Sequence, residues 1–352
     1  MATRRMFLAG LAALTVPTRS WADVGSPAFL VAGKSGQTHV LHGVTEQGES
    51  LFAIDLPGRG HAAAAHPRKP QAVAFARRPG VFAIVLNCHD GSVQHRITPP
   101  DGRQFNGHGV FSADGRVLYT SEVVARTSEG RIGLWDTDGY TRIAEWASGG
   151  IGPHDLKRQH DGALIVANGG IATDPDDRTK LNIDSMRPNL TRIAADGRID
   201  TQAELPDSLR RNSIRHLALG ADGLVAFAMQ WEGDPSDDVP QLGLWRPGTS
   251  LVLCPPPQSE AQRMKGYAGS IAMTDDGMVA VTSPRGGVVM IHNPDGTHRM
   301  THVRADVCGV APSADGFVVS DGSGVLWNCG ATTFRPLTTG GPAWDNHLVR
   351  LT

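Results

Sequence analysis

The sequence has little of three things that would mark common classes of protein. Aromatic residues make up 6% of its 352 residues, there are 4 cysteines, and the formal net charge is −2. Without an excess of clustered positive charge, nucleic acid is an unlikely partner. No apolar run after the N-terminus is long enough to span a bilayer, so we expect no membrane span there. Cys88, Cys254, Cys308 and Cys329 lack C-x-x-C spacing, which excludes a zinc knuckle and leaves one disulfide of unknown pairing open.

The first 22 residues have the pattern of an export signal. Arg4-Arg5-Met6-Phe7-Leu8 matches the twin-arginine motif, a weakly apolar stretch follows, and Ser20-Trp21-Ala22 offers small residues for a signal peptidase. We therefore predict a signal peptide over 1–22, a single domain over 23–352, and a periplasmic location. Loss of three arginines would move the formal charge from −2 to −5.

Glycine (42 residues) and proline (23) are plentiful, which favours many short strands joined by tight turns. One unit recurs: a polar residue, an apolar strand, a turn and a second apolar strand. Most copies turn at Asp-Gly, the hairpin signal of a type I′ turn. The polar residues that open the copies are His66, His108, His154, His216, Tyr267, Cys308 and His347. The spacing between successive opening residues, with four strand candidates in each interval, is typical of propeller blades.

The two ends of the chain complete the count of blades. The segment 344–351 is an inner strand without a hairpin partner, and 28–54 holds three outer strands without an inner one. The sequence therefore predicts an all-β, seven-bladed β-propeller in which a C-terminal inner strand joins the N-terminal outer strands, hiding exposed sheet edges.

Propeller geometry would bring the residues that open the inner strands to one mouth of the channel, together with the ends of the second strands. Imidazole is a common ligand for transition metals, and a carboxylate would complete a set suited to iron. We predict metal ligands at His66, His108, Glu122, His154, His216 and His347. We predict ligand-binding groups at Asn168, Arg215, Gln230, Tyr267, Arg285 and Asp321. Two alternatives stay open: the histidines tie neighbouring blades by hydrogen bonds, or the mouth binds an anion through Arg215 and Arg285.

Several longer motifs resemble one bacterial family. They include Gly107-His-Gly-Val-Phe-Ser, Ala167-Asn-Gly-Gly-Ile171, Ser213-Ile-Arg-His-Leu217 and Trp344-Asp-Asn-His347. The family is catalogued as domain of unknown function 1513, and it is similar to YVTN-type and quinoprotein-type propellers. The resemblance implies a periplasmic role beside imelysin-like iron-uptake proteins and a di-haem oxidoreductase, with no established activity.

The sequence thus favours a non-enzymatic propeller that binds a ligand or metal, with iron or another transition metal as its cofactor, or that docks partners of an iron-uptake system. An enzyme, lactonase-like or a metal-dependent oxidoreductase, is the main alternative. A third reading is an interaction scaffold that uses the acidic loops 169–188 and 231–240.

Overall fold

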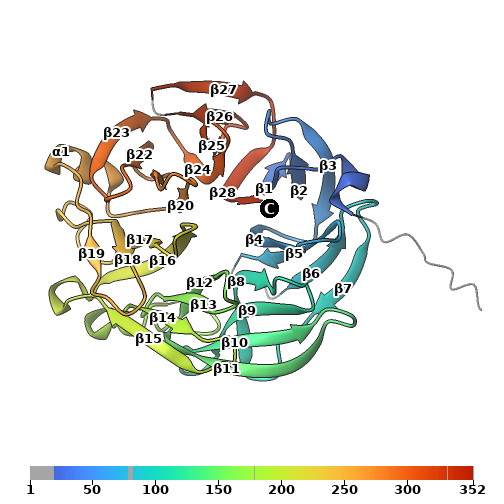
Figure 1. The fold of residues 1–352 in the computed structure, drawn as a ribbon, viewed down its shortest axis with the longest axis horizontal. Helices are drawn as coiled ribbons and strands as arrows, with labels where there is room; N and C mark the ends of the chain where they lie inside the picture. Colours follow the sequence, from blue (N-terminus) through green and yellow to red (C-terminus); the bar gives the residue numbers. More distant parts are fainter. Residues whose placement is uncertain (1–19, 78–81, 178, 331, 352) are drawn as a thin grey trace, which may run out of the picture.

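The computed structural model describes residues 20–77, 82–177, 179–330 and 332–351. Its strands form seven sheets of four strands, arranged around a central channel as the blades of a propeller (Figure 1). All adjacent strands within a sheet are antiparallel. The predicted all-β, seven-bladed fold is confirmed. No described helix is long and apolar enough to cross a membrane.

The first three blades, inner strand first, share the same meander of four strands. The closing blade consists of β28 (Ala343–Arg350), β1 (Phe29–Ser35), β2 (Thr38–Val44) and β3 (Ser50–Leu56). The next consists of β4 (Gly60–Ala65), β5 (Gln71–Ala76), β6 (Ala83–Asn87) and β7 (Val93–Ile97). The third consists of β8 (Arg103–Phe111), β9 (Val117–Val124), β10 (Glu129–Asp136) and β11 (Thr141–Ile151).

The other four blades repeat this order. They are β12 (Pro153–Arg158), β13 (Leu164–Asn168), β14 (Asn189–Ile193) and β15 (Ile199–Glu204); then β16 (Asn212–Leu219), β17 (Val225–Trp231), β18 (Leu242–Trp245) and β19 (Val252–Leu253). They continue with β20 (Ser270–Met273), β21 (Val279–Ser283), β22 (Val288–His292) and β23 (His298–Val303); then β24 (Val307–Ser313), β25 (Gly316–Asp321), β26 (Leu326–Cys329) and β27 (Phe334–Thr338). Short helical turns are η1 (Trp21–Val24), η2 (Ile183–Ser185), η3 (Asp207–Leu209), α1 (Gln258–Ala261) and η4 (Gln262–Met264).

The ring is closed by the C-terminal strand. Strand β28 pairs with β1 from Phe29↔Arg350 to Lys34↔Ala343, so the chain's last strand completes the sheet that its first three strands begin. The predicted closure is therefore confirmed. It removes the unpaired inner edge that β1 would otherwise present to the channel.

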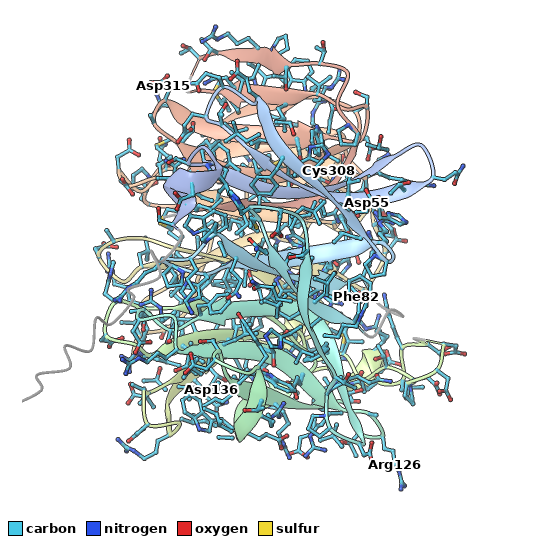
Figure 2. All side chains as sticks on the ribbon, turned by 90° about the vertical axis from the view of Figure 1, so that its right-hand side faces the viewer. Asp55, Phe82, Arg126, Asp136, Cys308 and Asp315 are labelled. Carbon is cyan, nitrogen blue, oxygen red and sulfur yellow. The ribbon has the colours of Figure 1, made fainter. Side chains whose placement is uncertain are left out.

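Apolar side chains between neighbouring blades hold the ring together. Phe75, Phe105 and Trp135 pack between the second and third blades, and Phe227 and Trp245 lie in the cluster between the fourth and fifth. Figure 2 shows the molecule from the side, with Cys308 and Asp315, at the two ends of β24, towards opposite faces. We call the face where the inner strands begin the top face and the face where they end the bottom face.

The Asp-Gly turns are confirmed in place but differ in type. Gly115, Gly162, Gly223 and Gly277 have φ between 76° and 86°, whereas the preceding aspartates are not among the described residues with positive φ. A type I′ turn needs positive φ at both central residues, so these connections are turns closed by a single left-handed glycine.

One blade was assigned wrongly from sequence. The polar residue that opens its inner strand is His61 in β4, and His66 follows the end of that strand. The sequence also favours a turn at Pro79-Gly80 after an inner strand opened by His66, but this segment falls between β5 and β6 and lies outside the described residues. The error has a physical cause: β4 is built mainly from alanines, which are depleted in strands and gave no strand signal.

The predicted signal peptide falls on residues 1–19, which lie outside the described residues, and on 20–22, which are described. Trp21 in η1 packs against the apolar cluster between the closing blade and the second blade and donates its indole N–H to the carbonyl of His66 at 2.8 Å. The export signal and the cleavage site remain predictions.

Candidate functional site

Five histidines from five different blades meet inside the channel. They are His61 of β4, His108 of β8, His154 of β12, His216 of β16 and His347 of β28. The ring of His108 lies between 4.7 and 5.9 Å, centroid to centroid, from each of the other four. We call these residues the histidine cluster.

An irregularity in strand pairing accompanies each histidine of the cluster. The pairing register shifts between Gly60 and Ala63, Phe105 and Gly109, Pro153 and Leu156, and Ile214 and His216, and opposite Val31 and Gly33 in the sheet of His347. A β-bulge bends its strand and re-aims a side chain. Of the two inner strands that contribute no histidine, β20 pairs with β21 in regular register, whereas β24 has a shift of the same kind between Val307 and Val310, at Cys308. The bulge therefore marks the opening residue of six inner strands, and at five of them it directs an imidazole towards the axis.

Two groups of three histidines have the spacing of metal ligands. The ligand nitrogens of His61, His108 and His347 lie within 4.8 Å of one another, and so do those of His108, His154 and His216. His108 belongs to both groups. Its Nε2 is 3.2 Å from Nε2 of His61, close to the edge of about 3.3 Å between two nitrogens that a tetrahedral zinc holds at about 2.05 Å.

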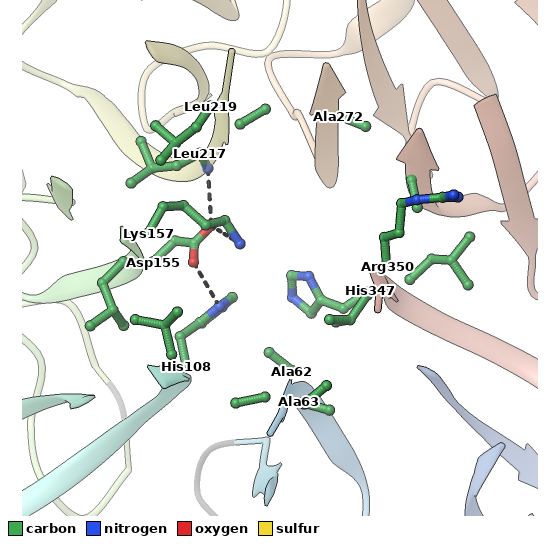
Figure 3. A pocket seen from close by; sticks show the side chains of 18 of the residues that line it. Ala62, Ala63, His108, Asp155, Lys157, Leu217, Leu219, Ala272, His347 and Arg350 are labelled. Carbon is green, nitrogen blue, oxygen red and sulfur yellow. Dashed lines mark hydrogen bonds and ion pairs between the residues drawn. The ribbon is translucent and has the colours of Figure 1, made fainter. Parts of the chain in front are cut away.

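Asp155 orients His108. Its carboxylate lies 3.3 Å from Nδ1 of His108, accepts the backbone N–H of Leu217 at 3.0 Å, and lies 3.4 Å from Nζ of Lys157 (Figure 3). An imidazole that gives its Nδ1–H to a carboxylate has the lone pair of Nε2 available, which is the arrangement around most metal-bound histidines. Burial alone would raise the pKa of Asp155, but Lys157 and His108 outweigh it and lower that pKa, so the carboxylate is ionised.

Four imidazoles of the cluster, those of His61, His154, His216 and His347, are held neutral. Burial, followed by the charges of neighbouring histidines, puts the pKa of His61, His154 and His347 well below the usual range. Burial also lowers the pKa of His216 to about 3. Arg77 and Arg215 add positive charge near His61 and His154 and act in the same direction. A neutral imidazole is the form that binds metal.

Two ring nitrogens of the cluster are buried without any partner. Among the described residues, Nδ1 of His61 and Nε2 of His347 have no hydrogen bond. Native proteins pair nearly all buried polar atoms, so each such atom calls for an explanation. The imidazole of His108 contacts His61 of β4 and Asp155 of β12. It therefore links neighbouring blades, as the alternative of hydrogen bonds between blades predicts. That alternative does not account for the orphaned nitrogens of His61 and His347.

The remaining predicted metal ligands lie elsewhere. Nδ1 of His66 accepts the backbone N–H groups of Arg68 and Lys69 near the bottom face. Glu122 is buried within the third blade, where it binds Nη1 of Arg142 at 2.7 Å. Burial raises the pKa of Glu122 more than Thr120 and Arg142 lower it. The structure does not bring either residue to the cluster.

The predicted ligand-binding residues do not converge on one site. The Asn168 amide donates to Asn189 and Thr191 of its own blade and to the main-chain carbonyl of Ser148 in β11 of the neighbouring blade. Gln230 donates to the carbonyl of Ala268, beside Tyr267, whose ring carries the Arg285 guanidinium at 4.3 Å. Arg215 is the bulged residue beside His216 and contributes charge to the cluster. Gln230, Tyr267 and Arg285 thus lie together, Asn168 lies apart from them, and Arg215 alone adjoins the histidines.

Asp321 is an internal tie of the last blade. It is fully buried and accepts Nε of Arg304 at 2.7 Å, the Trp327 indole N–H at 2.8 Å, and the backbone N–H groups of Ser323 and Val325. Removing one partner of such a buried network leaves the others unpaired. Asp321→Ala should therefore lower the free energy of unfolding by about 2–3 kcal/mol, measured by urea denaturation. A loss below about 1 kcal/mol would contradict this role.

Sequence reasoning missed His61, Asp155 and Lys157. His61 precedes His108 by 47 residues, close to the interval of 46 from His108 to His154, so the repeat spacing held a signal for it. Asp155 follows His154 directly, but its pairing with His108 of another blade gives no local signal. The four cysteines are buried and unpaired.

The geometry can be set beside known proteins. The model of a family described as "Protein of unknown function (DUF1513)" matches residues 54–351. No curated protein matches the chain. Among solved structures, the Kuenenia stuttgartiensis hydrazine synthase is similar with a TM-score of 0.62 and 12% identity, covering 90% of this chain and 96% of that one. At that identity the likeness concerns the propeller fold alone. Because the family model spans most of the sequence, the chain belongs to this family of proteins of unknown function (DUF1513).

Proposed function

We propose that this propeller binds a transition metal ion in its channel through the histidine cluster. The observation that carries the proposal is the convergence of five imidazoles, in two groups of three with the spacing of metal ligands, around the carboxylate-oriented His108. A metal ion could take a buried lone pair such as that of Nε2 of His347, which has no hydrogen bond among the described residues. The cost of burying so many polar rings would then be offset by coordination.

The donor set indicates which ions fit. Imidazole nitrogen suits zinc, copper, nickel and iron(II), and the order of affinities among divalent ions places copper highest. No carboxylate is a member of either histidine group. The predicted combination of histidines with the Glu122 carboxylate is therefore not formed, and the donor set does not favour iron over the other ions. Iron in a periplasmic uptake system, with imelysin-like or di-haem partners, remains the cellular setting that we propose from the family resemblance.

The test is metal analysis of the protein purified after native export, followed by titration of metal-free protein with zinc, copper(II) and iron(II). We expect about one ion per chain and a raised melting temperature, and we expect the variant with His108→Ala and His154→Ala to lose both. His292→Gln is the matched control, because His292 is equally buried but bonds Gly296 outside the cluster. Binding that survives in the double variant, or no binding by the wild type, would refute the proposal.

A further inference from the structure

A cavity of about 390 Å³ lies along the channel axis between the histidine cluster and the bottom face. All seven inner strands contribute to its walls, and its size is in the range of small-molecule pockets. His108, His216 and His347 line it, so the cavity reaches the cluster directly. A ligand in this cavity would meet the metal that we propose there.

The lining divides into a polar end and apolar walls. His108, His347, Asp155 and Lys157 lie together in the pocket, and aliphatic side chains such as Ala62, Leu217 and Ala272 surround them (Figure 3). A site with a few convergent polar groups and apolar walls fixes one end of a ligand and buries the rest.

The charge at the polar end is unbalanced once a metal is bound. The cluster supplies imidazoles, and Asp155, the one carboxylate among the described residues that line the cavity, is already shared by His108, Lys157 and the Leu217 N–H. A divalent ion would therefore add two positive charges to a buried site in which Lys157 offsets Asp155. Buried charge without a counter-charge is costly, so the site should recruit an anion.

The entrance of the cavity carries a positive charge, as the metal-loaded cluster would. Arg158 lines the cavity near the bottom face, and its guanidinium bonds the main-chain carbonyls of Phe111 and Gln159, not a carboxylate. Such a cation attracts anions towards the opening.

We infer that the cavity binds a small organic acid, with its carboxylate at the metal-loaded cluster and Lys157 and its apolar body along the aliphatic walls. This inference rests on the proposed metal function. It places the working entrance at the bottom face, where the inner strands end.

The experiment compares benzoate with benzamide, its neutral counterpart of the same shape, by calorimetry on the zinc-loaded full chain. We expect benzoate to bind at least about 10-fold more tightly than benzamide, since one charge-assisted contact is worth about that factor. Removing zinc should weaken benzoate binding by a similar factor. In protein saturated with zinc, Lys157→Met, which keeps the apolar stem, should raise the benzoate Kd about 10-fold.

A second variant tests the location of the ligand. Ala62→Leu places extra volume in the cavity and should abolish benzoate binding while zinc is retained. Equal binding of benzoate and benzamide by the zinc-loaded protein, or wild-type benzoate binding in Ala62→Leu, overturns the inference and leaves the metal proposal standing. Failure to load zinc at all overturns both.

Discussion

Metal-free protein should lose stability steeply as the pH falls below about 6.5, the usual pKa of histidine in an unfolded chain. Burial lowers the pKa of His61, His154, His216 and His347 in the folded state. At acidic pH these histidines therefore bind protons in the unfolded chain that they do not bind in the folded chain. Their contribution is fully present above about pH 6.5, and it is lost as the pH falls from there towards the folded pKa, which is about 3 for His216.

The expected magnitude follows from proton linkage. Between about pH 6.5 and about pH 5.5, each such histidine lowers the free energy of unfolding by about 1 kcal/mol, so the four together lower it by on the order of 4 kcal/mol. Urea denaturation in the presence of a chelator, repeated across this range, measures the loss. A metal ion, which binds the neutral rings, should restore stability in the same range.

Two variants separate the cluster from other effects. His154→Gln should remove about 1 kcal/mol of the pH-dependent loss over that interval. Ser121→Ala is the control: the Ser121 hydroxyl bonds the carbonyls of His108 and His154, so its removal costs stability without removing a titrating group. If His154→Gln keeps the wild-type pH dependence, the cluster is not what makes the protein sensitive to acid.

The fold could be predicted because its signals are local and repeated. Asp-Gly turns such as that at Gly115 recur between apolar strands, and the unpaired strand at the C-terminus implies closure with the first three. Blade number follows from these features without knowledge of any long-range contact. The one misplaced strand, β4, lacks that local signal, because four of its six residues are alanines, which have a low strand propensity.

The site could be predicted only in part, because it depends on bulges and on pairs between blades. His108, His154, His216 and His347 were expected to converge, and they do. Glu122 was expected beside them because the end of a second strand returns to the top face. Its side chain instead meets Arg142, 20 residues along the chain in the same blade. Side-chain packing decides whether Glu122 pairs with Arg142 in its own blade or turns towards the channel axis. The spacing of residues along the sequence does not reveal that packing.

Asp155→Asn should weaken zinc binding by about 10- to 100-fold although Asp155 belongs to neither group of candidate ligands. The substitution keeps an oxygen for the Leu217 N–H but removes the negative charge beside Nδ1 of His108 and Nζ of Lys157. His108 then loses basicity at Nε2, and Lys157 becomes an unbalanced cation next to the metal. Both changes disfavour a divalent ion.

Competition between the protein and a chelator of known affinity measures this change. Asp321→Asn is the matched control, because it neutralises a carboxylate that is equally buried in another blade and bonded to Arg304. That variant should lose stability and keep the wild-type zinc affinity. Equal losses of affinity in the two variants would mean that general destabilisation, and not the orientation of His108, explains the effect. A selective loss in Asp155→Asn would identify His108, the one histidine shared by both groups, as the ligand on which the whole cluster depends.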